Sequence, residues 1–340
     1  MQKKWFDETG KCGLIAVSSR VRLARNLKGY PFPGRMSREH RQAVLKDVGS
    51  ALERMDGGFT FTDLTDSDVY SARALMEKRL ISPEFSEGRE VRGLFLSENE
   101  SLSIMVCEED HLRIQALGAG LCLDACLENA LKTDEALDAK LSYAFDEMLG
   151  YLTHCPTNLG TALRASVMLH LPALKESGAM RSVAANCGKL GFAVRGLYGE
   201  GSNAQGALFQ ISNQVTLGFS EKQLIERLAD VVGQIIGMEQ SQRASGFSRD
   251  KTAVEDRVWR ALGLLTSARR MSSDEAMRLV SDLRTGVSLG IIDTVGIPDL
   301  NRLLWDIQPA CLCVSHGGFF PPQELDSLRA GLLRSRLTRC

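Results

Sequence analysis

The chain has 340 residues and a mass of 37.3 kDa, enough to bury a sizeable core and to form two domains. Hydrophobic residues make up 44% and charged residues 24%, as in ordinary soluble globular proteins, and the formal net charge of -1 argues against bulk affinity for nucleic acid or membranes. No apolar run approaches the roughly 18 residues of a membrane-spanning helix. The N-terminus lacks the apolar core of a signal peptide, so we expect a cytoplasmic protein.

The nine cysteines are odd in number and follow no repeated spacing, which predicts reduced thiols rather than a disulfide framework. Cys122 and Cys126 are separated by three residues, and Cys311, Cys313 and His316 form a second close group. Neither group has a matched second pair at the usual zinc spacing. We therefore expect no dedicated metal site.

The N-terminal segment leads through Val17 into Ser18-Ser-Arg-Val-Arg22, where Arg20 and Arg22 share one face if the chain is extended. Apolar residues at helical spacing predict an amphipathic helix over 37–55. A second helix is predicted over 65–80, capped by Thr65 or Asp66 and stopped before Pro83.

Three strands are predicted over 91–117, with a turn at 98–100. A charged connection, Cys-Glu-Glu-Asp-His, joins the second and third strands and includes Glu108 and Glu109. Alternation along a strand predicts that these two carboxylates point to opposite faces, with Arg113 nearby on the next strand. Taken alone, the segment is also typical of a solvated hairpin turn.

A helix is predicted over 134–151, followed by a loop that begins at Cys155 and enters a second helix, 161–171, carrying Arg164. Strands are predicted over 190–197 and 207–217. They flank Arg195-Gly-Leu-Tyr-Gly-Glu-Gly-Ser202, whose glycines around Glu200 indicate a mobile loop. The order of elements predicts an antiparallel sheet flanked by helices, an α+β fold.

Residues 221–340 show helical periodicity, with breaks expected at 245–248 and at the two prolines 321–322. We therefore predict a domain of mixed strands and helices over 1–220 and an all-helical domain over 221–340. No Walker glycine-lysine loop and no His-Arg-Asp motif is present, which argues against the commoner ATP-using folds.

Arginine side chains bind phosphate oxygens well. Five arginines lie in motifs that also hold carboxylates, which predicts a polyphosphate ligand such as ATP; they are Arg20, Arg22, Arg113, Arg164 and Arg195. The four blocks around Arg20, Glu109, Cys155 and Glu200, in this order, resemble the catalytic domain of the ATP:guanido phosphotransferases (phosphagen kinases), whose fold is glutamine synthetase-like. The resemblance covers about Trp5 to Glu221 and continues more weakly to the C-terminus, where it is similar to the bacterial protein arginine kinase (McsB) branch.

The resemblance implies roles for individual residues. Glu109 and Glu200 match the carboxylates that hold the acceptor guanidinium and remove its proton, and Cys155 matches the family's reactive cysteine. Arg79 stands near the place of an adenine-stacking residue. The resemblance implies that the ATP phosphates bind to Ser18, Arg20, Arg22, Arg113, Arg164 and Arg195. It also implies that Mg²⁺ bridges the phosphates.

Metabolite-specific relatives carry a helical substrate-binding domain ahead of the first arginine motif, and here only 19 residues precede Arg20. This favours arginine on a protein chain as the acceptor. The resemblance further implies a homodimer formed through the helical domain, and as partners a Clp ATPase/protease system, a zinc-finger activator and a heat-shock repressor.

Three positions depart from the family pattern. Cys107 replaces the usual asparagine, Asn203 stands where a second acid often follows, and Leu325 replaces the first arginine of an Arg-Asp-x-x-Arg-Ala motif. Asp326 and Arg329 keep that motif's other polar residues, which in the family bind phosphoarginine as an allosteric signal. Two alternatives remain open: a non-catalytic adaptor of the same fold, and a kinase of free arginine.

Overall fold

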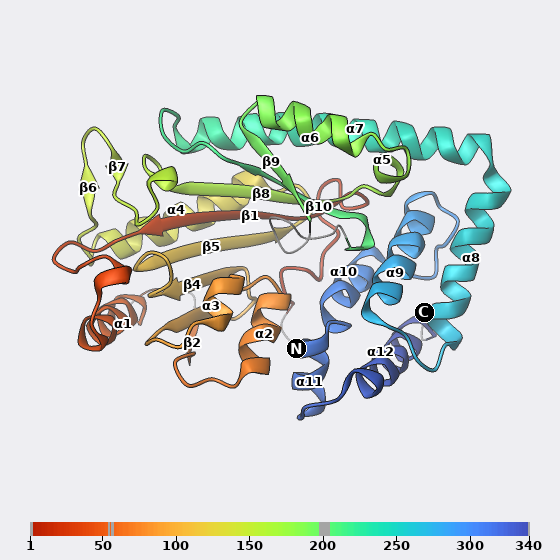
Figure 1. The fold of residues 1–340 in the computed structure, drawn as a ribbon. Helices are drawn as coiled ribbons and strands as arrows, with labels where there is room; N and C mark the ends of the chain where they lie inside the picture. The colour runs from red at the N-terminus through yellow and green to blue at the C-terminus, as the bar shows by residue number, and fades with distance from the viewer. Residues whose placement is uncertain (1–2, 54, 56–57, 197–204, 339–340) are drawn as a thin grey trace.

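A computed structural model describes residues 3–53, 55, 58–196 and 205–338. Its centre is an eight-stranded sheet in which every pairing is antiparallel and the strand order is β2-β3-β4-β5-β1-β8-β10-β9 (Figure 1). A separate two-stranded hairpin is formed by β6 (Phe145–Asp146) and β7 (Gly150–Tyr151). The main strands are β1 (Ala16–Arg25), β2 (Phe59–Asp63), β3 (Gly93–Ser97), β4 (Leu102–Val106), β5 (Leu112–Ala119), β8 (Leu163–His170), β9 (Phe192–Arg195) and β10 (Leu208–Asn213).

Strand β1 lies between β5 and β8, and its alternating side chains separate the two faces of the sheet. Val21 and Leu23 are fully buried in the main hydrophobic core, whereas Arg20 and Arg22 point to the opposite face. Helices α1 (Arg38–Leu52), α4 (Leu123–Asp138) and α7 (Glu221–Arg249) cover the apolar face. The predicted common face of the two arginines is thus confirmed.

The helices begin at residues that satisfy their free N–H groups. Ser37 caps α1 in a capping box with His40, Asp68 caps α2, and Ser220 pairs with Gln223 at the start of α7. The helices are α1 (Arg38–Leu52), α2 (Val69–Glu77), α3 (Pro83–Glu87), α4 (Leu123–Asp138), α5 (Pro172–Glu176), α6 (Met180–Lys189), α7 (Glu221–Arg249), α8 (Lys251–Ser267), α9 (Ser273–Ser288), α10 (Ile297–Asp306), α11 (Pro309–His316) and α12 (Pro322–Leu337), with short 3-10 turns at Pro33–Arg35, Pro156–Asn158 and Gln205–Ala207.

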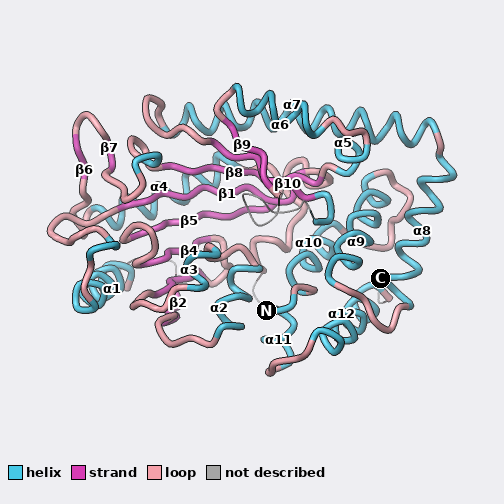
Figure 2. Tube along the Cα trace, in the orientation of Figure 1, coloured by secondary structure: helices cyan, strands magenta, loops and turns pink. Residues whose placement is uncertain are grey.

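Helices α8 to α12 gather beside the sheet, while the long α7 runs along it (Figures 1 and 2). The C-terminal helices share a second apolar cluster that also takes in Trp5 and Phe6 from the N-terminal segment. Leu228 and Val232 of α7, in contrast, belong to the core of the sheet. The division of the chain at residue 220 stays a prediction. Within the described ranges, no helix combines the length and apolarity that crossing a bilayer requires.

The predicted strands over 91–117 and the helix within 37–55 are confirmed. The predicted helix over 161–171 is wrong, because Leu163–His170 is strand β8, buried on both faces, and a continuous apolar run of this length fits either element. The helix expected over 134–151 ends at Asp138 and begins earlier, at Leu123. No break occurs at 245–248, since α7 continues to Arg249 and tolerates Gly246 at a cost of about 1 kcal/mol.

Candidate functional site

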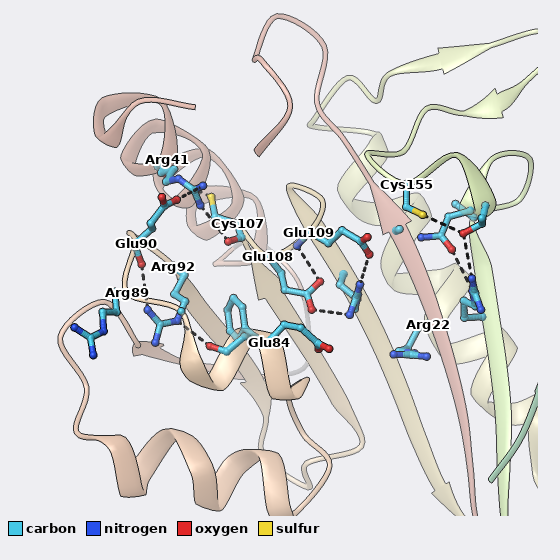
Figure 3. Close-up of a pocket in the computed structure, with 18 of the residues that line it drawn as sticks. Arg22, Arg41, Glu84, Arg89, Glu90, Arg92, Cys107, Glu108, Glu109 and Cys155 are labelled. Carbon is cyan, nitrogen blue, oxygen red and sulfur yellow. Dashed lines mark hydrogen bonds and ion pairs between the residues drawn. The ribbon is translucent and has the colours of Figure 1, made fainter. Parts of the chain in front are cut away.

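A pocket of about 590 Å³ opens on the arginine-bearing face of the sheet. Figure 3 shows Glu108 and Glu109 at its centre, with Arg22 and Cys155 on one side and Arg41, Arg89 and Arg92 on the other. The residues that the sequence singled out and that line the pocket are Arg22, Cys107, Glu108, Glu109, Arg113, Cys155, Arg164 and Arg195.

The strand register explains why arginines from distant parts of the chain meet. Arg22 of β1 lies opposite Arg164 of β8, and Arg113 of β5 lies opposite Ala24, two residues further along β1. Directly paired residues share a face of the sheet, so these guanidiniums project from the same side. Arg195 of β9 lies opposite Gln210 of β10, so these two residues also share a face of the sheet. The arginines of these four strands therefore lie on one face of the sheet.

This cluster of like charges is held at a cost. Burial, followed by repulsion from neighbouring guanidiniums, lowers the pKa of both Arg20 and Arg22 well below its ordinary value. Arg164 donates from Nε to Asn158 Oδ1 over 3.1 Å, while Arg22 Nε is buried without a hydrogen-bond partner among the described residues. A bound polyanion would satisfy the free donor and relieve the repulsion. The donor set therefore fits the phosphates of ATP.

Three further predicted residues lie on the same face but do not line the pocket. Gln210 Oε1 accepts hydrogen bonds from Arg20 Nη2, at 2.9 Å, and from Arg79 Nη2. The Arg79 side chain is buried against Met168, and Ser18 is buried in β1. Their contacts with phosphate or adenine remain predictions.

The two adjacent acids lie in a tight turn after β4 rather than on the strand itself. Cys107 has a positive φ of 64°, which breaks the strand alternation. Both carboxylates consequently turn to Arg113, with Glu108 Oε1 2.6 Å from Nη1 and Glu109 Oε2 3.0 Å from Nη2. The prediction that they point to opposite faces is wrong. Asparagine tolerates this conformation better than most residues, so Cys107→Asn is compatible with the turn.

The turn is anchored from several sides. Asp110 is fully buried and its Oδ1 accepts from Asn26 Nδ2 at 2.6 Å and from the His154 N–H at 2.7 Å. The His111 ring accepts from the Leu27 N–H at Nδ1 and contacts the Pro31 carbonyl through Nε2. Sequence reasoning did not single out Asp110 and Asn26 as anchors of this turn, because their contact joins residues 84 apart in the chain.

Glu108 and Glu109 differ in environment and hence in what they can do. The Glu108 side chain is only 4% exposed and also accepts from Ser82 Oγ at 2.5 Å, so it is fixed in place. The Glu109 side chain is 39% exposed at the pocket surface. Burial raises the pKa of Glu109, the Arg113 charge opposes this rise, and Asp110 and Glu108 add to it. Glu109 is therefore the carboxylate of the pair that a bound substrate can reach, and its raised pKa suits it to accept a proton.

Cys155 begins a 3-10 turn at the pocket wall, half-buried, with its Sγ 3.0 Å from Thr157 Oγ1. Arg164 Nη2 donates to the same hydroxyl oxygen over 3.4 Å. The thiol therefore lies beside the arginine cluster, as the motif predicts. Glu200 and Asn203 lie outside the described residues, so their predicted positions are not described here.

Asp326 and Arg329 lie in α12, apart from the pocket. Arg329 is buried and donates to the carbonyls of Ile307 and Met271, each at 2.8 Å, and to Asp326 Oδ1 at 2.7 Å. These bonds fasten α12 to the preceding helices. Phosphoarginine binding at this place stays a prediction. No cluster of three or more His, Cys, Asp or Glu side chains suited to a metal ion occurs in the part of the chain that the structure describes.

Two protein families match the chain. Residues 42–242 match the C-terminal catalytic domain of ATP:guanido phosphotransferases, and residues 251–340 match the C-terminal domain of the protein-arginine kinase McsB. Together the matches cover the pocket residues from Glu84 onward and the helices that follow α7, while the pocket residues Arg22, Ala24 and Arg41 lie ahead of the first match.

Relatives named protein-arginine kinase match almost the whole chain. The protein of Symbiobacterium thermophilum is 45% identical over 99% of this chain and 97% of its own length, and that of Desulforamulus reducens 46% identical over 98% and 95%. The Bacillus subtilis protein is 42% identical over 98% of this chain and 93% of its own. Identity at this level over full length shows common membership of one family.

Solved structures of phosphagen kinases share the fold. The duplicated taurocyamine kinase of Schistosoma mansoni, with bound components of a transition-state analogue, superposes with a TM-score of 0.63 at 29% identity, over 70% of this chain and 35% of that longer one. Lombricine kinase gives a TM-score of 0.61 at 26% identity, over 68% of each chain. The predicted α+β fold is confirmed. The chain belongs to the ATP:guanido phosphotransferase family and, within it, to the protein-arginine kinases.

Proposed function

We propose that this enzyme transfers the γ-phosphoryl group of ATP to the guanidinium group of arginine residues in protein substrates. The observation that carries the proposal is the pocket that holds Glu109 beside Arg113, with Arg22 and Arg164 on the neighbouring strands of the same face. The relatives' name, protein-arginine kinase, supports a protein acceptor.

The chemistry requires a base because a guanidinium, with a pKa of about 12 or more, has no free lone pair for attack. In the proposed reaction Glu109 holds the acceptor guanidinium and takes one N–H proton. The freed nitrogen forms a bond to the γ-phosphorus while the bond from that phosphorus to the bridging oxygen breaks. ADP leaves with the electron pair of the broken bond. Glu109 is positioned for this task by its contact with Arg113.

The arginine cluster supplies the second requirement, neutralisation of phosphate charge. Arg22, Arg113, Arg164 and Arg195 line the pocket and would hold the polyphosphate. Mg²⁺, when bound with ATP, would neutralise part of the phosphate charge. Cys155 and Glu200 are proposed as further contacts to the acceptor guanidinium, on the strength of the motif match.

The wider setting is proposed from the same resemblance. Phosphorylated proteins would pass to a Clp ATPase/protease system, a heat-shock repressor would be one target, and a zinc-finger protein would act as activator. Residues 221–340 would form a homodimer and read phosphoarginine through Asp326 and Arg329. The enzyme would work in the cytoplasm.

A comparison of acceptors tests the proposal. Mg-ATP labelled at the γ position is incubated with the enzyme and either an unfolded protein or free arginine, and acid-labile label is counted on each. We expect label on the protein. Label on free arginine alone would assign the enzyme to metabolite phosphorylation, and absence of label on both by a folded, ATP-binding sample would favour an adaptor.

Replacement of Arg22 by alanine is expected to raise the KM for ATP by roughly 10- to 100-fold, because about 1.5–3 kcal/mol is lost with a charge-assisted hydrogen bond. Lysine at this position should give a smaller rise, since it keeps the charge but not the planar fork. Initial rates at varied ATP measure the effect. Arg89→Ala, an exposed arginine on the far side of the same pocket, is the control. An equal rise in Arg89→Ala would contradict the role given to Arg22.

The pH dependence of the rate follows from Glu109. Its carboxylate must be deprotonated to accept a proton, and burial raises its pKa above the ordinary value of 4.5. The kcat is therefore expected to fall as the pH decreases through that raised pKa, and to be constant just above it. A pH profile of kcat measures this limb. If the residual activity of Glu109→Gln fell over the same pH range, the titrating group would be another residue and not Glu109.

A further inference from the structure

A second hollow, about 560 Å³, lies between α1 and the edge of the sheet formed by β2 and β3. Its apolar lining is formed by Leu45, Leu52, Met55, Phe59, Phe61 and Phe95. Phe61 is 47% exposed although its ring centroid lies 4.9 Å from that of Phe95. We call this hollow the edge groove.

Two glycines keep the edge groove open. A Cβ on Gly93 would lie 2.6 Å from the Phe61 ring and 2.7 Å from Leu45, so only glycine lets these side chains rest on β3. A Cβ on Gly49 would meet the Phe95 ring at an ordinary 3.4 Å, so a larger side chain there would enter the groove. Apolar surface left uncovered in this way favours a partner.

The strand beside the groove is an open edge. β2 pairs with β3 on one side, and none of the described strands pairs with its other side. Its sequence, Phe-Thr-Phe-Thr-Asp, lacks the lysine or proline with which proteins commonly block pairing at an edge. Its free N–H and C=O groups suit an extended segment of another chain, with alternate side chains reaching the groove.

The edge groove lies on the apolar face of the sheet, under α1, and it comes close to the pocket at the end of the sheet where the pocket reaches Arg41. Arg41 and Leu45 are one turn apart on α1, and Arg41 lines the pocket while Leu45 lines the groove. At the end of β2, Asp63 pairs with Gly93, which directly follows the pocket residue Arg92. One helical turn spans about 6 Å and an extended residue about 3.3 Å. A chain that passes round this end of the sheet from one site to the other therefore needs at least roughly two to four residues between them.

We propose that the edge groove docks an unfolded segment of the protein substrate, which adds a strand to β2 and places an aromatic or large aliphatic side chain in the groove. The proposal rests on the proposed protein-arginine kinase activity. An unfolded acceptor is specified because edge pairing requires an extended backbone whose own hydrogen bonds are unmade. The enzyme then favours arginines that have an apolar residue about three positions away.

Two single-arginine peptides test the proposal, one with phenylalanine three residues to each side of the arginine and one with serine there. We expect a kcat/KM roughly tenfold higher for the phenylalanine peptide, the effect of burying one large apolar side chain. Gly49→Leu, which fills the groove, and Phe61→Ser, which removes its exposed wall, should reduce this preference to about twofold or less. The KM for ATP and the rates on the serine peptide should not change.

Gly233→Leu is the matched control, because Gly233 is an exposed helical glycine of α7 with nothing within 4 Å of its Cβ position. Leucine is the better helix former, so neither glycine variant should lower Tm through helix propensity. A preference retained in both groove variants, or an equal loss on both peptides, would overturn the proposal. So would a change in oligomeric state without a change in preference, which would make the groove a contact between copies.

Fluorescence anisotropy of the same labelled peptides separates this proposal from the activity. If the wild type phosphorylates neither peptide, the proposed function fails. Tighter binding of the phenylalanine peptide, weakened by Phe61→Ser and unchanged by Gly233→Leu, would still support the groove. Equal binding of the two peptides would overturn it.

Discussion

Glu109→Gln is expected to lower kcat by roughly 10²- to 10⁴-fold, the range that a positioned general base contributes. Glutamine keeps the shape and the hydrogen-bond acceptor of the side chain but cannot take the guanidinium proton. Arg113 keeps its contact with Glu108 at 2.6 Å, so the phosphate-binding face should stay in place and the KM for ATP should change little. Steady-state rates with an unfolded acceptor measure both constants.

The matched control is Glu84→Gln, an exposed acid that lines the same pocket but has no ion pair among the described residues. Its kcat should stay within about twofold of the wild type. A similar fall in both variants would point to loss of general negative charge rather than of a base. An active Glu109→Gln enzyme would remove Glu109 from the role proposed here.

Arg243→Ala is expected to lower the free energy of unfolding by roughly 3–5 kcal/mol, the cost of leaving a buried charge without its partner. Arg243 lies where α7 meets the end of β8 and α9. Its Nε donates to Glu239 Oε1 at 2.7 Å, and its Nη groups reach His170 and Ser288. Glu239, fully buried, also accepts from the N–H groups of Ala173 and Leu174 at the start of α5. Urea unfolding measures the change.

Arg260→Ala provides the comparison, because Arg260 makes an exposed i,i+4 ion pair with Asp256 at 4.0 Å. Pairs of this kind contribute about 0.3–0.5 kcal/mol. Equal losses in the two arginine variants would mean that the buried network around Glu239 contributes no more than a surface pair. That outcome would contradict the role of the network in joining α7 to the sheet.

The sequence predicts the chemistry of the site better than the elements that carry it. Arg20 and Arg22 are two residues apart, and strand alternation alone places them on one face. Arg164 lines the pocket, as its motif implies, but it lies on a strand and not on the predicted helix. A strand buried on both faces of a sheet shows no alternation of apolar and polar residues, so the sequence pattern does not identify it as a strand. The positive φ of Cys107 similarly has no signature in the residue type.

Local sequence patterns do not show which distant strands pair in the sheet. The position of β1 between β5 and β8 decides which arginines meet, yet β8 follows β1 by more than a hundred residues. The buried contact between Asn26 and Asp110, which fixes the turn holding Glu109, depends on that same placement. The site residues could still be predicted, because the order of the motifs matches a family whose fold brings those motifs together.

The most direct test of the central claim is a ³¹P NMR spectrum of an unfolded, arginine-containing protein after incubation with the enzyme and Mg-ATP. Transfer to a guanidinium nitrogen creates a phosphorus–nitrogen bond, which is stable in base and lost in acid. We predict a protein-bound phosphoramidate signal that disappears on acidification and forms at least about 100-fold more slowly with Glu109→Gln. A protein-bound signal that survives acid, indicating a phosphate ester on a hydroxyl group, would contradict the account.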